Sequence, residues 1–127
     1  MIRTLLVRSE KGGFPNLEAV MVNNDAEISR AESGSDALSK ITDQFYHLIV
    51  VDEKLPDVTG LELAEKLILK NPMSNVALVS SLSQEDFHEA SEGLGLLMQL
   101  SPQPDSTEAE ILLKHLKSIL QATGVTT

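Results

Sequence analysis

The feature that most constrains the fold is an unbroken apolar run, Leu48–Val51, that ends on a carboxylate at Asp52. The run is too short for a helix and lacks the polar alternation of a half-exposed strand, which indicates a strand covered on both faces. In open α/β sheets, ligands bind outside the carboxyl ends of the strands. Asp52 is therefore a candidate reactive group, and Pro56 and Gly60 predict a shaped loop behind it.

Short apolar runs alternate with helical patterns along the rest of the chain. Strands are predicted at residues 4–7, 27–31, 48–51, 76–79 and 96–100. A helix is predicted after each strand, and the start signals are Pro15, the turn at Ser33–Asp36, Ser83–Asp86 and the Thr-x-x-Glu boxes that begin at Thr59 and Thr107. Five strands that alternate with five helices imply a three-layer α/β domain with a parallel sheet and right-handed crossovers.

The bulk composition predicts one soluble globular domain over residues 1–127, with a core over about residues 2–121. Hydrophobic residues make up 42% of the chain, and no apolar run is long enough for a membrane span. The chain has no cysteine, which excludes disulfides and fits a cytoplasmic protein. A net charge of −9 argues against nucleic acid as a direct partner, so we expect protein partners.

The loop after the central strand carries a specific motif. Asp52, Leu55, Pro56 and Gly60 reproduce the spacing Asp-x-x-(Leu/Met)-Pro-x-x-x-Gly. This stretch resembles the signature of the receiver domains of two-component response regulators, and the resemblance extends over about residues 2–121. It implies a CheY-like, flavodoxin-like fold with the sheet order 2-1-3-4-5.

The resemblance also implies a site. A receiver accepts a phosphoryl group from a phosphohistidine onto an aspartate, and cations must neutralise the repulsion between the two negative groups. By resemblance, Asp52 is the phosphoacceptor, Ser80 is the hydroxyl residue and Lys54 supplies a metal-binding backbone carbonyl. The implied cofactor is Mg²⁺, and the implied partner is a sensor histidine kinase or another signalling protein.

Several of the family's positions are altered in this chain. Arg8 and Ser9 stand where the family has its two metal-binding acids, and Ser101 replaces the lysine that precedes Pro102. Only Glu10 remains nearby as a further carboxylate, so the metal ligands that can be named are Asp52, Glu10 and the carbonyl of Lys54. A hard cation needs an octahedral set of oxygen ligands, so we expect Mg²⁺ binding to be drastically weakened.

Structural interpretations remain open for the same residues. Asp52 can cap its own loop, and Ser80 and Ser81 can serve as turn residues. Lys54 is typical of a solvated surface charge, and Met98, at the family's aromatic switch position, is typical of packing. The three histidines share no spacing that fits a metal site and are interpreted as surface or boundary residues: His47, His88 and His115.

These observations favour a degenerate receiver that works as a protein-interaction module in signal transduction and is not an enzyme. Two alternatives stay open: a working receiver that a histidine kinase phosphorylates on Asp52, and a small enzyme that uses Asp52 as a nucleophile. We expect partners on the face formed by the helix that begins near Ser83, the strand 96–100 and the last helix, where Ile111 lies off the apolar stripe. The resemblance allows a homodimer through this face.

A last expectation concerns Arg8. In a 2-1-3-4-5 sheet the first and third strands are neighbours, so Arg8 and Asp52 emerge at the same edge. We predict that the Arg8 guanidinium takes the place of the missing cation and bonds the Asp52 carboxylate through two parallel contacts. The alternative is that Arg8 turns to solvent or meets Glu10.

Overall fold

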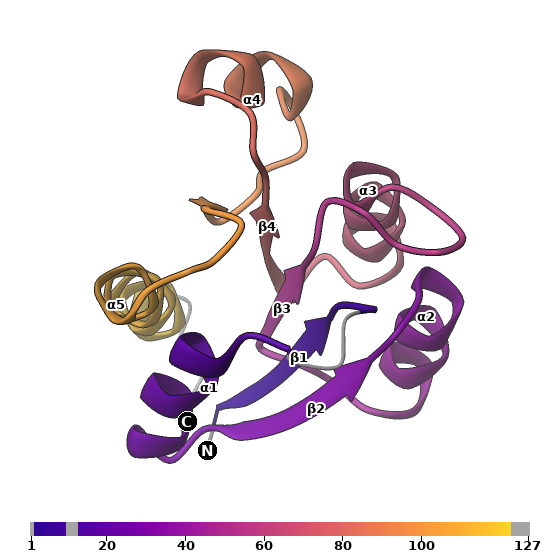
Figure 1. The fold of residues 1–127 in the computed structure, drawn as a ribbon. Coiled ribbons are helices and arrows are strands. Elements are labelled where there is room, and N and C mark those ends of the chain that lie inside the picture. Colours follow the sequence, from indigo (N-terminus) through magenta and orange to yellow (C-terminus); the bar gives the residue numbers. More distant parts are fainter. Residues whose placement is uncertain (1, 10–12, 123–127) are drawn as a thin grey trace.

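The computed structural model describes residues 2–9 and 13–122 of the chain. Its parallel strands pair in the order β2-β1-β3-β4-β5, as Figure 1 shows. The elements are β1 Arg3–Val7, α1 Pro15–Asn23, β2 Glu27–Ala31, α2 Gly34–Asp43, β3 Leu48–Val51, α3 Gly60–Lys70, β4 Asn75–Val79, α4 Gln84–Ala90, β5 Gln99–Leu100 and α5 Ser106–Ala122. The predicted architecture and the sheet order implied by the resemblance are confirmed.

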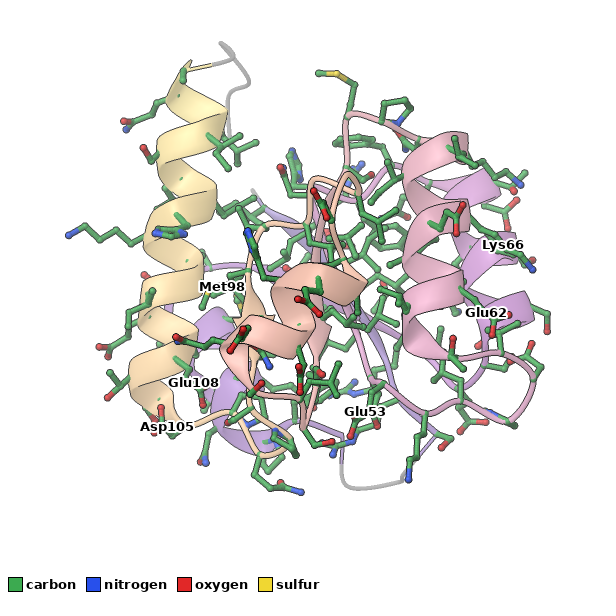
Figure 2. The ribbon with its side chains drawn as sticks, turned by 90° about the horizontal axis from the view of Figure 1, so that it is seen from above. Glu53, Glu62, Lys66, Met98, Asp105 and Glu108 are labelled. Atoms are coloured by element: carbon green, nitrogen blue, oxygen red, sulfur yellow. The ribbon has the colours of Figure 1, made fainter. Side chains whose placement is uncertain are left out.

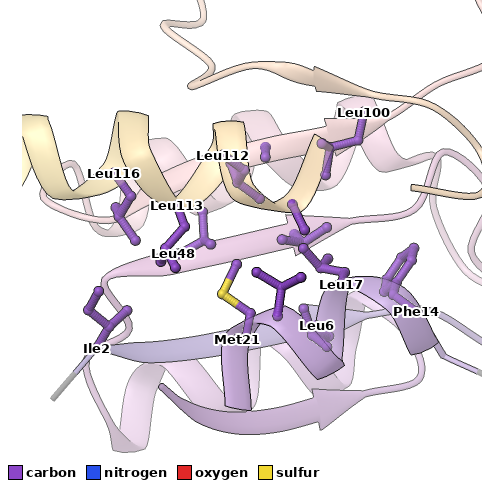
Figure 3. Close-up of a cluster of buried hydrophobic side chains, with 14 of the residues drawn as sticks. Ile2, Leu6, Phe14, Leu17, Met21, Leu48, Leu100, Leu112, Leu113 and Leu116 are labelled. Atoms are coloured by element: carbon purple, nitrogen blue, oxygen red, sulfur yellow. The ribbon is translucent and has the colours of Figure 1, made fainter. Parts of the chain in front are cut away.

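The helices cover both faces of the sheet. On one face α1 and α5 pack against alternate strand residues, in the cluster that Figure 3 shows. On the other face lie α2, α3 and Phe87 of α4. Leu48 and Val50 point to the first layer, and Ile49 and Val51 point to the second. All four are fully buried, which explains why this strand lacks polar alternation.

Side-chain caps begin three helices where they are predicted. Ser33, Thr59 and Ser83 each accept a hydrogen bond from the backbone N–H three residues later. These bonds satisfy amide groups that the first turn of a helix leaves without partners. Pro15 also lies in the first turn of α1, as predicted.

The predicted cap of α5 is wrong. The reciprocal bonds join Asp105 and Glu108 instead of Thr107 and Glu110: the Glu108 N–H donates to Asp105 Oδ1 (2.8 Å) and the Asp105 N–H donates to Glu108 Oε2 (3.1 Å). The helix therefore begins at Ser106, one residue before the predicted cap.

The fifth strand is shorter than predicted. β5 covers Gln99–Leu100 instead of residues 96–100. Gly95 has a positive φ of 69°, so the chain is still turning when it enters this segment. Contact with β4 begins only at Leu97, whose N–H donates to the carbonyl of Val76 (2.7 Å). β5 is an edge strand of the sheet, as expected.

None of the helices in the described ranges combines the length and the apolar character that a membrane crossing requires.

Candidate functional site

Asp52 lies at the carboxyl end of β3 and is 8% exposed. Its backbone N–H donates to the carbonyl of Val7 at 3.0 Å, which continues the pairing with β1. Both carboxylate oxygens have partners. Oδ1 accepts from the N–H of Glu53 at 2.9 Å, and Oδ2 accepts from Nε of Arg8 at 3.1 Å.

The Arg8 guanidinium connects three loops at this edge of the sheet. Besides the bond from Nε to Asp52, Nη1 donates to the carbonyl of Gly13 (2.8 Å) and Nη2 donates to the carbonyl of Pro102 (3.1 Å). The Cζ atom lies 4.4 Å from the centre of the Phe14 ring, in the range of a cation–π contact. The residue is 8% exposed. Arg8 therefore joins the loops that follow β1, β3 and β5.

The predicted pair between Arg8 and Asp52 is thus confirmed as an ion pair of 3.1 Å. The predicted geometry of two parallel contacts is wrong, because both terminal nitrogens bond backbone carbonyls instead. The guanidinium divides its donors among three acceptors, which its fixed fork of N–H groups permits. A fixed positive charge therefore lies against the Asp52 carboxylate.

The described residues do not fit a Mg²⁺ site. Ser9 is exposed and Glu10 lies outside the described residues. The Lys54 side chain is exposed, and its backbone forms a bridge with Thr59 across the loop. Within residues 2–9 and 13–122, no three His, Cys, Asp or Glu side chains are grouped to hold a metal ion. An octahedral cation that needs oxygen ligands does not suit a carboxylate already bonded to a guanidinium.

The two serines after β4 have different roles. Ser80 is buried, and its Oγ accepts from the N–H of Leu82 at 3.2 Å, which is local turn chemistry. Ser81 donates its N–H (2.9 Å) and its Oγ (3.2 Å) to Oε2 of Glu53. Glu53 therefore ties the loop after β3 to the loop after β4.

Ser101 faces the start of α5. Its N–H and Oγ donate to the two oxygens of Glu108 at 2.8 and 2.6 Å. Figure 2 labels Glu108 beside Asp105 at the beginning of this helix. The neighbouring Pro102 contributes its carbonyl to Arg8. The position of the family's lysine is thus taken by a hydroxyl that is bonded to a carboxylate.

Asp57 links the loop after β3 to α2. Its Oδ1 accepts from the N–H of Gly34 and its Oδ2 accepts from the N–H of Ser35, both at 2.9 Å. These two bonds favour the charged carboxylate and hold the pKa of Asp57 below its ordinary value. The loop after β3 is therefore fixed at its middle as well as at its start.

Gly60 explains the last position of the signature. A Cβ atom at this residue would lie 2.2 Å from the carbonyl oxygen of Asp52 and 2.9 Å from the Cα of Glu53. The Gly60 N–H also donates to the carbonyl of Glu53 at 2.9 Å. Only a residue without a side chain permits this close approach of α3 to the loop that carries Asp52.

Two further predicted residues lie away from Asp52. His47 is buried, with 8% of its surface exposed, instead of being a surface or boundary residue. Its Nδ1 accepts from the N–H of Arg3 at 2.9 Å, at the opposite edge of the sheet. Burial lowers the pKa of His47, because it disfavours the charged imidazolium. Met98 is half-buried and packs against the α1/α5 side of the core, as its interpretation as a packing residue requires.

Glu53, Asp57 and Glu108 are the site residues that sequence reasoning missed. Glu53 and Asp57 accept bonds from segments distant in the sequence, and Glu108 accepts bonds from the loop that precedes α5. The signal available for Glu53 was the sheet order, because parallel β3 and β4 bring the residues that follow them to one edge.

Comparisons with known proteins agree with this fold. The family model for the response regulator receiver domain matches residues 14–105. Response regulator ArlR of Staphylococcus aureus is 30% identical over 67 residues, which cover 53% of this chain and 31% of ArlR. The chain therefore matches less than a third of that relative's length.

Solved receiver structures superpose on nearly the whole chain. The response regulator receiver domain protein (CheY-like) from Methanospirillum hungatei JF-1 has a TM-score of 0.79 at 23% identity, over 96% of this chain and 95% of that one. The signal receiver domain of an HD domain-containing protein from Pseudomonas fluorescens Pf-5 has a TM-score of 0.84 at 16% identity, over 99% and 93%.

Proposed function

Because this chain belongs to the family of response regulator receiver domains of two-component systems, we propose that it is a degenerate receiver that phosphorylation does not switch. Its role is that of a protein-interaction module in signal transduction. The observation that carries this proposal is the Arg8 guanidinium, which bonds the Asp52 carboxylate where the family has acids and a metal.

The charges around Asp52 oppose phosphoryl transfer. The incoming group carries two or more negative charges, and catalysis of such a transfer depends on cations placed at its oxygens. Here one oxygen of Asp52 is engaged by Arg8 and the other by a backbone N–H. The carboxylate of Glu53, on the same loop as Asp52, and that of Glu108, in the first turn of α5, add negative charge at this edge of the sheet. We therefore expect Mg²⁺ to bind weakly or not at all.

The test is incubation with acetyl phosphate and Mg²⁺, followed by measurement of the intact mass. We expect no stoichiometric gain of a phosphoryl group and no saturable binding of beryllofluoride. The alternative function, a working phosphoacceptor, requires a mass gain that depends on Mg²⁺ and is abolished by Asp52→Asn. Release of inorganic phosphate well beyond one equivalent would instead indicate an enzyme with Asp52 as its nucleophile.

A variant with the family's charges restored serves as the matched control. Arg8→Asp, Ser9→Asp and Ser101→Lys together return two metal-binding acids and the lysine to the edge of the sheet. We expect this variant to gain Mg²⁺ affinity by titration calorimetry and to accept a phosphoryl group on Asp52. If the restored variant stays inert while its fold is intact, the altered charges are not what blocks the chemistry.

An interaction module that phosphorylation does not switch acts through a partner protein, and the family indicates which class of protein this is. Receiver domains interact with histidine kinases and other signalling proteins, and we propose such a cytoplasmic protein as the partner here. The face that we assign to it comprises α4, β5 and α5. Leu82 and Ile111 are each 45% exposed on or beside these elements, which supports this choice.

A further inference from the structure

A hollow of about 340 Å³ lies between α4 and the segment that leads into β5. Its apolar lining comes from Phe87, Leu96 and Met98, and Gly93 and Gly95 lie in its wall. A Cβ atom at either glycine would meet no heavy atom within 4 Å, so this wall is open to a partner's side chains. Figure 2 shows Met98 between α4 and α5.

Phe87 and His88 in the second half of α4 line this hollow. Ser91 and Glu92, which follow the helix directly, line it as well. Glu85 lies on the same face of α4 as His88, because it precedes His88 by three residues. Glu89 is also exposed, next to this face. The apolar lining is thus bordered by carboxylates.

The charge of this region differs from that of the rest of the chain. Residues 71–113 contain none of the ten Lys and Arg residues, yet they contain seven of the 19 acidic residues: Glu85, Asp86, Glu89, Glu92, Asp105, Glu108 and Glu110. The lysines that follow this range, Lys114 and Lys117, line a separate hollow beside Asn24 at the end of α1. The exposed carboxylates on or directly after α4, those of Glu85, Asp86, Glu89 and Glu92, therefore have no Lys or Arg among the residues 71–113 that surround them in the sequence.

From this pairing of an apolar hollow with an acidic border, we infer that the surface of α4 and β5 binds a basic amphipathic helix of a partner protein. The inference rests on the proposed function and names the chemistry of its partner. Apolar side chains of such a helix enter the hollow, and its Lys or Arg residues meet the carboxylates on α4 and that of Glu92 directly after it.

A second copy of this chain fits the same surface poorly. A symmetric dimer through this face would place one acidic α4 surface close to another, and like charges across an interface oppose association. Lys114 and Lys117 do not relieve this repulsion, because they lie on the α1 side of α5. The charge distribution thus selects a basic partner over a second copy.

The probe is a fluorescent synthetic peptide of about four helical turns, with Leu at i, i+3, i+4 and i+7 and Lys elsewhere. Anisotropy gives its Kd for the unmodified chain, and amide NMR shifts map where it binds. A peptide with Glu in place of Lys and a scrambled Leu/Lys peptide are the controls. We expect saturable binding of the first peptide only, with shifts concentrated on residues 84–98.

Variants of the protein distinguish binding at this site from general attraction of the basic peptide by the net negative charge of the chain. Glu85→Lys, Glu89→Lys and Glu92→Lys together should raise the Kd by at least about tenfold. A matched variant with the same change in net charge, made from the exposed Glu27, Asp43 and Glu65, should raise it by less than about threefold. Replacing Glu85, Glu89 and Glu92 by Gln is the milder variant, and circular dichroism checks that each variant folds.

Equal losses in both sets of lysine variants, equal binding of the scrambled peptide, or shifts spread over other acidic surfaces would overturn the inference. A dimer found by sedimentation and broken by the α4 lysine variant would assign the face to a second copy instead. These measurements use the unphosphorylated chain, so their failure is distinct from a failure of the phosphorylation test.

Discussion

Replacement of Arg8 by Ala tests the central contact of the site. The substitution removes the bond to Asp52, the bonds to the carbonyls of Gly13 and Pro102, and the contact with the Phe14 ring. It also removes a positive charge from the side of the Asp52 carboxylate, which is 8% exposed.

The size of the effect follows from this burial. Removing one partner of a buried ion pair destabilises a protein by about 3–5 kcal/mol, because the remaining charge stays desolvated. Hydrogen bonds to charged groups contribute about 1.5–3 kcal/mol each, but contributions within one network overlap. We therefore expect Arg8→Ala to lower the free energy of unfolding by about 3–5 kcal/mol, which is a large part of the stability of a domain of this size.

A second ion pair of the same chain is the control. Arg30 bonds Glu18, but the Arg30 side chain is 65% exposed. Exposed pairs contribute about 0–1 kcal/mol, and salt screens them. Urea denaturation of Arg8→Ala and Arg30→Ala, at low and high salt, measures both effects. The loss in Arg8→Ala should persist at high salt, whereas the small loss in Arg30→Ala should vanish.

The reasoning is refuted if Arg8→Ala unfolds at the same urea concentration as Arg30→Ala, or if high salt removes its effect. Either result would mean that the guanidinium is solvated in solution and does not hold the three loops together. Asp52 would then be available to a metal ion, and the proposal of a degenerate receiver would lose its main support.

Two further predictions concern the loop behind Asp52. Gly60→Ala places a Cβ 2.2 Å from the Asp52 carbonyl oxygen and should lower the free energy of unfolding, measured in urea, by about 2–3 kcal/mol. Gly34→Ala is the control: its Cβ meets only side-chain atoms, and it should lower the free energy of unfolding by less than about 1 kcal/mol. The bonds from Gly34 and Ser35 lower the pKa of Asp57, so its folded carboxylate binds protons less readily than the unfolded one. Its stabilisation is present above the unfolded pKa of about 4 and is lost as the pH falls through the folded pKa. The difference in unfolding free energy between wild type and Asp57→Asn should therefore shrink below about pH 5, and a difference independent of pH would contradict this.

The strands could be predicted because burial on both faces leaves a clear pattern. Leu48–Val51 is found by its apolar run alone, and the other strands except β5 agree within one residue at each end. Periodicity does not determine which strands are neighbours, so the sheet order came from the resemblance to receivers. The errors arose where two segments satisfied the same local rule. Asp105 and Thr107 both precede an acid by three residues, and only Asp105 caps α5.

The contacts of the site could be predicted where the residues directly follow strands, and could not be predicted where they lie within loops. Arg8 and Asp52 each follow directly from a strand, so neighbouring strands bring them together. The bonds from Ser81 to Glu53 and from α2 to Asp57 depend on how far each loop extends from the sheet. Loop conformation leaves no periodic pattern in a sequence, and these contacts were therefore missed.

The arrangement at Asp52 also sets how strongly any cation can compete for this carboxylate. A divalent ion that binds Oδ2 must displace Arg8, which then loses a charged hydrogen bond of about 1.5–3 kcal/mol. Since each 1.4 kcal/mol is a factor of ten, this competition alone lowers the apparent affinity for the metal by roughly ten- to a hundredfold. The loss of two acid ligands acts in addition, because it removes favourable contacts from the bound state, whereas Arg8 stabilises the unbound state. Restoring only the acid at position 9 would leave this competition in place, so the change at position 8 both removes a ligand and introduces a competitor.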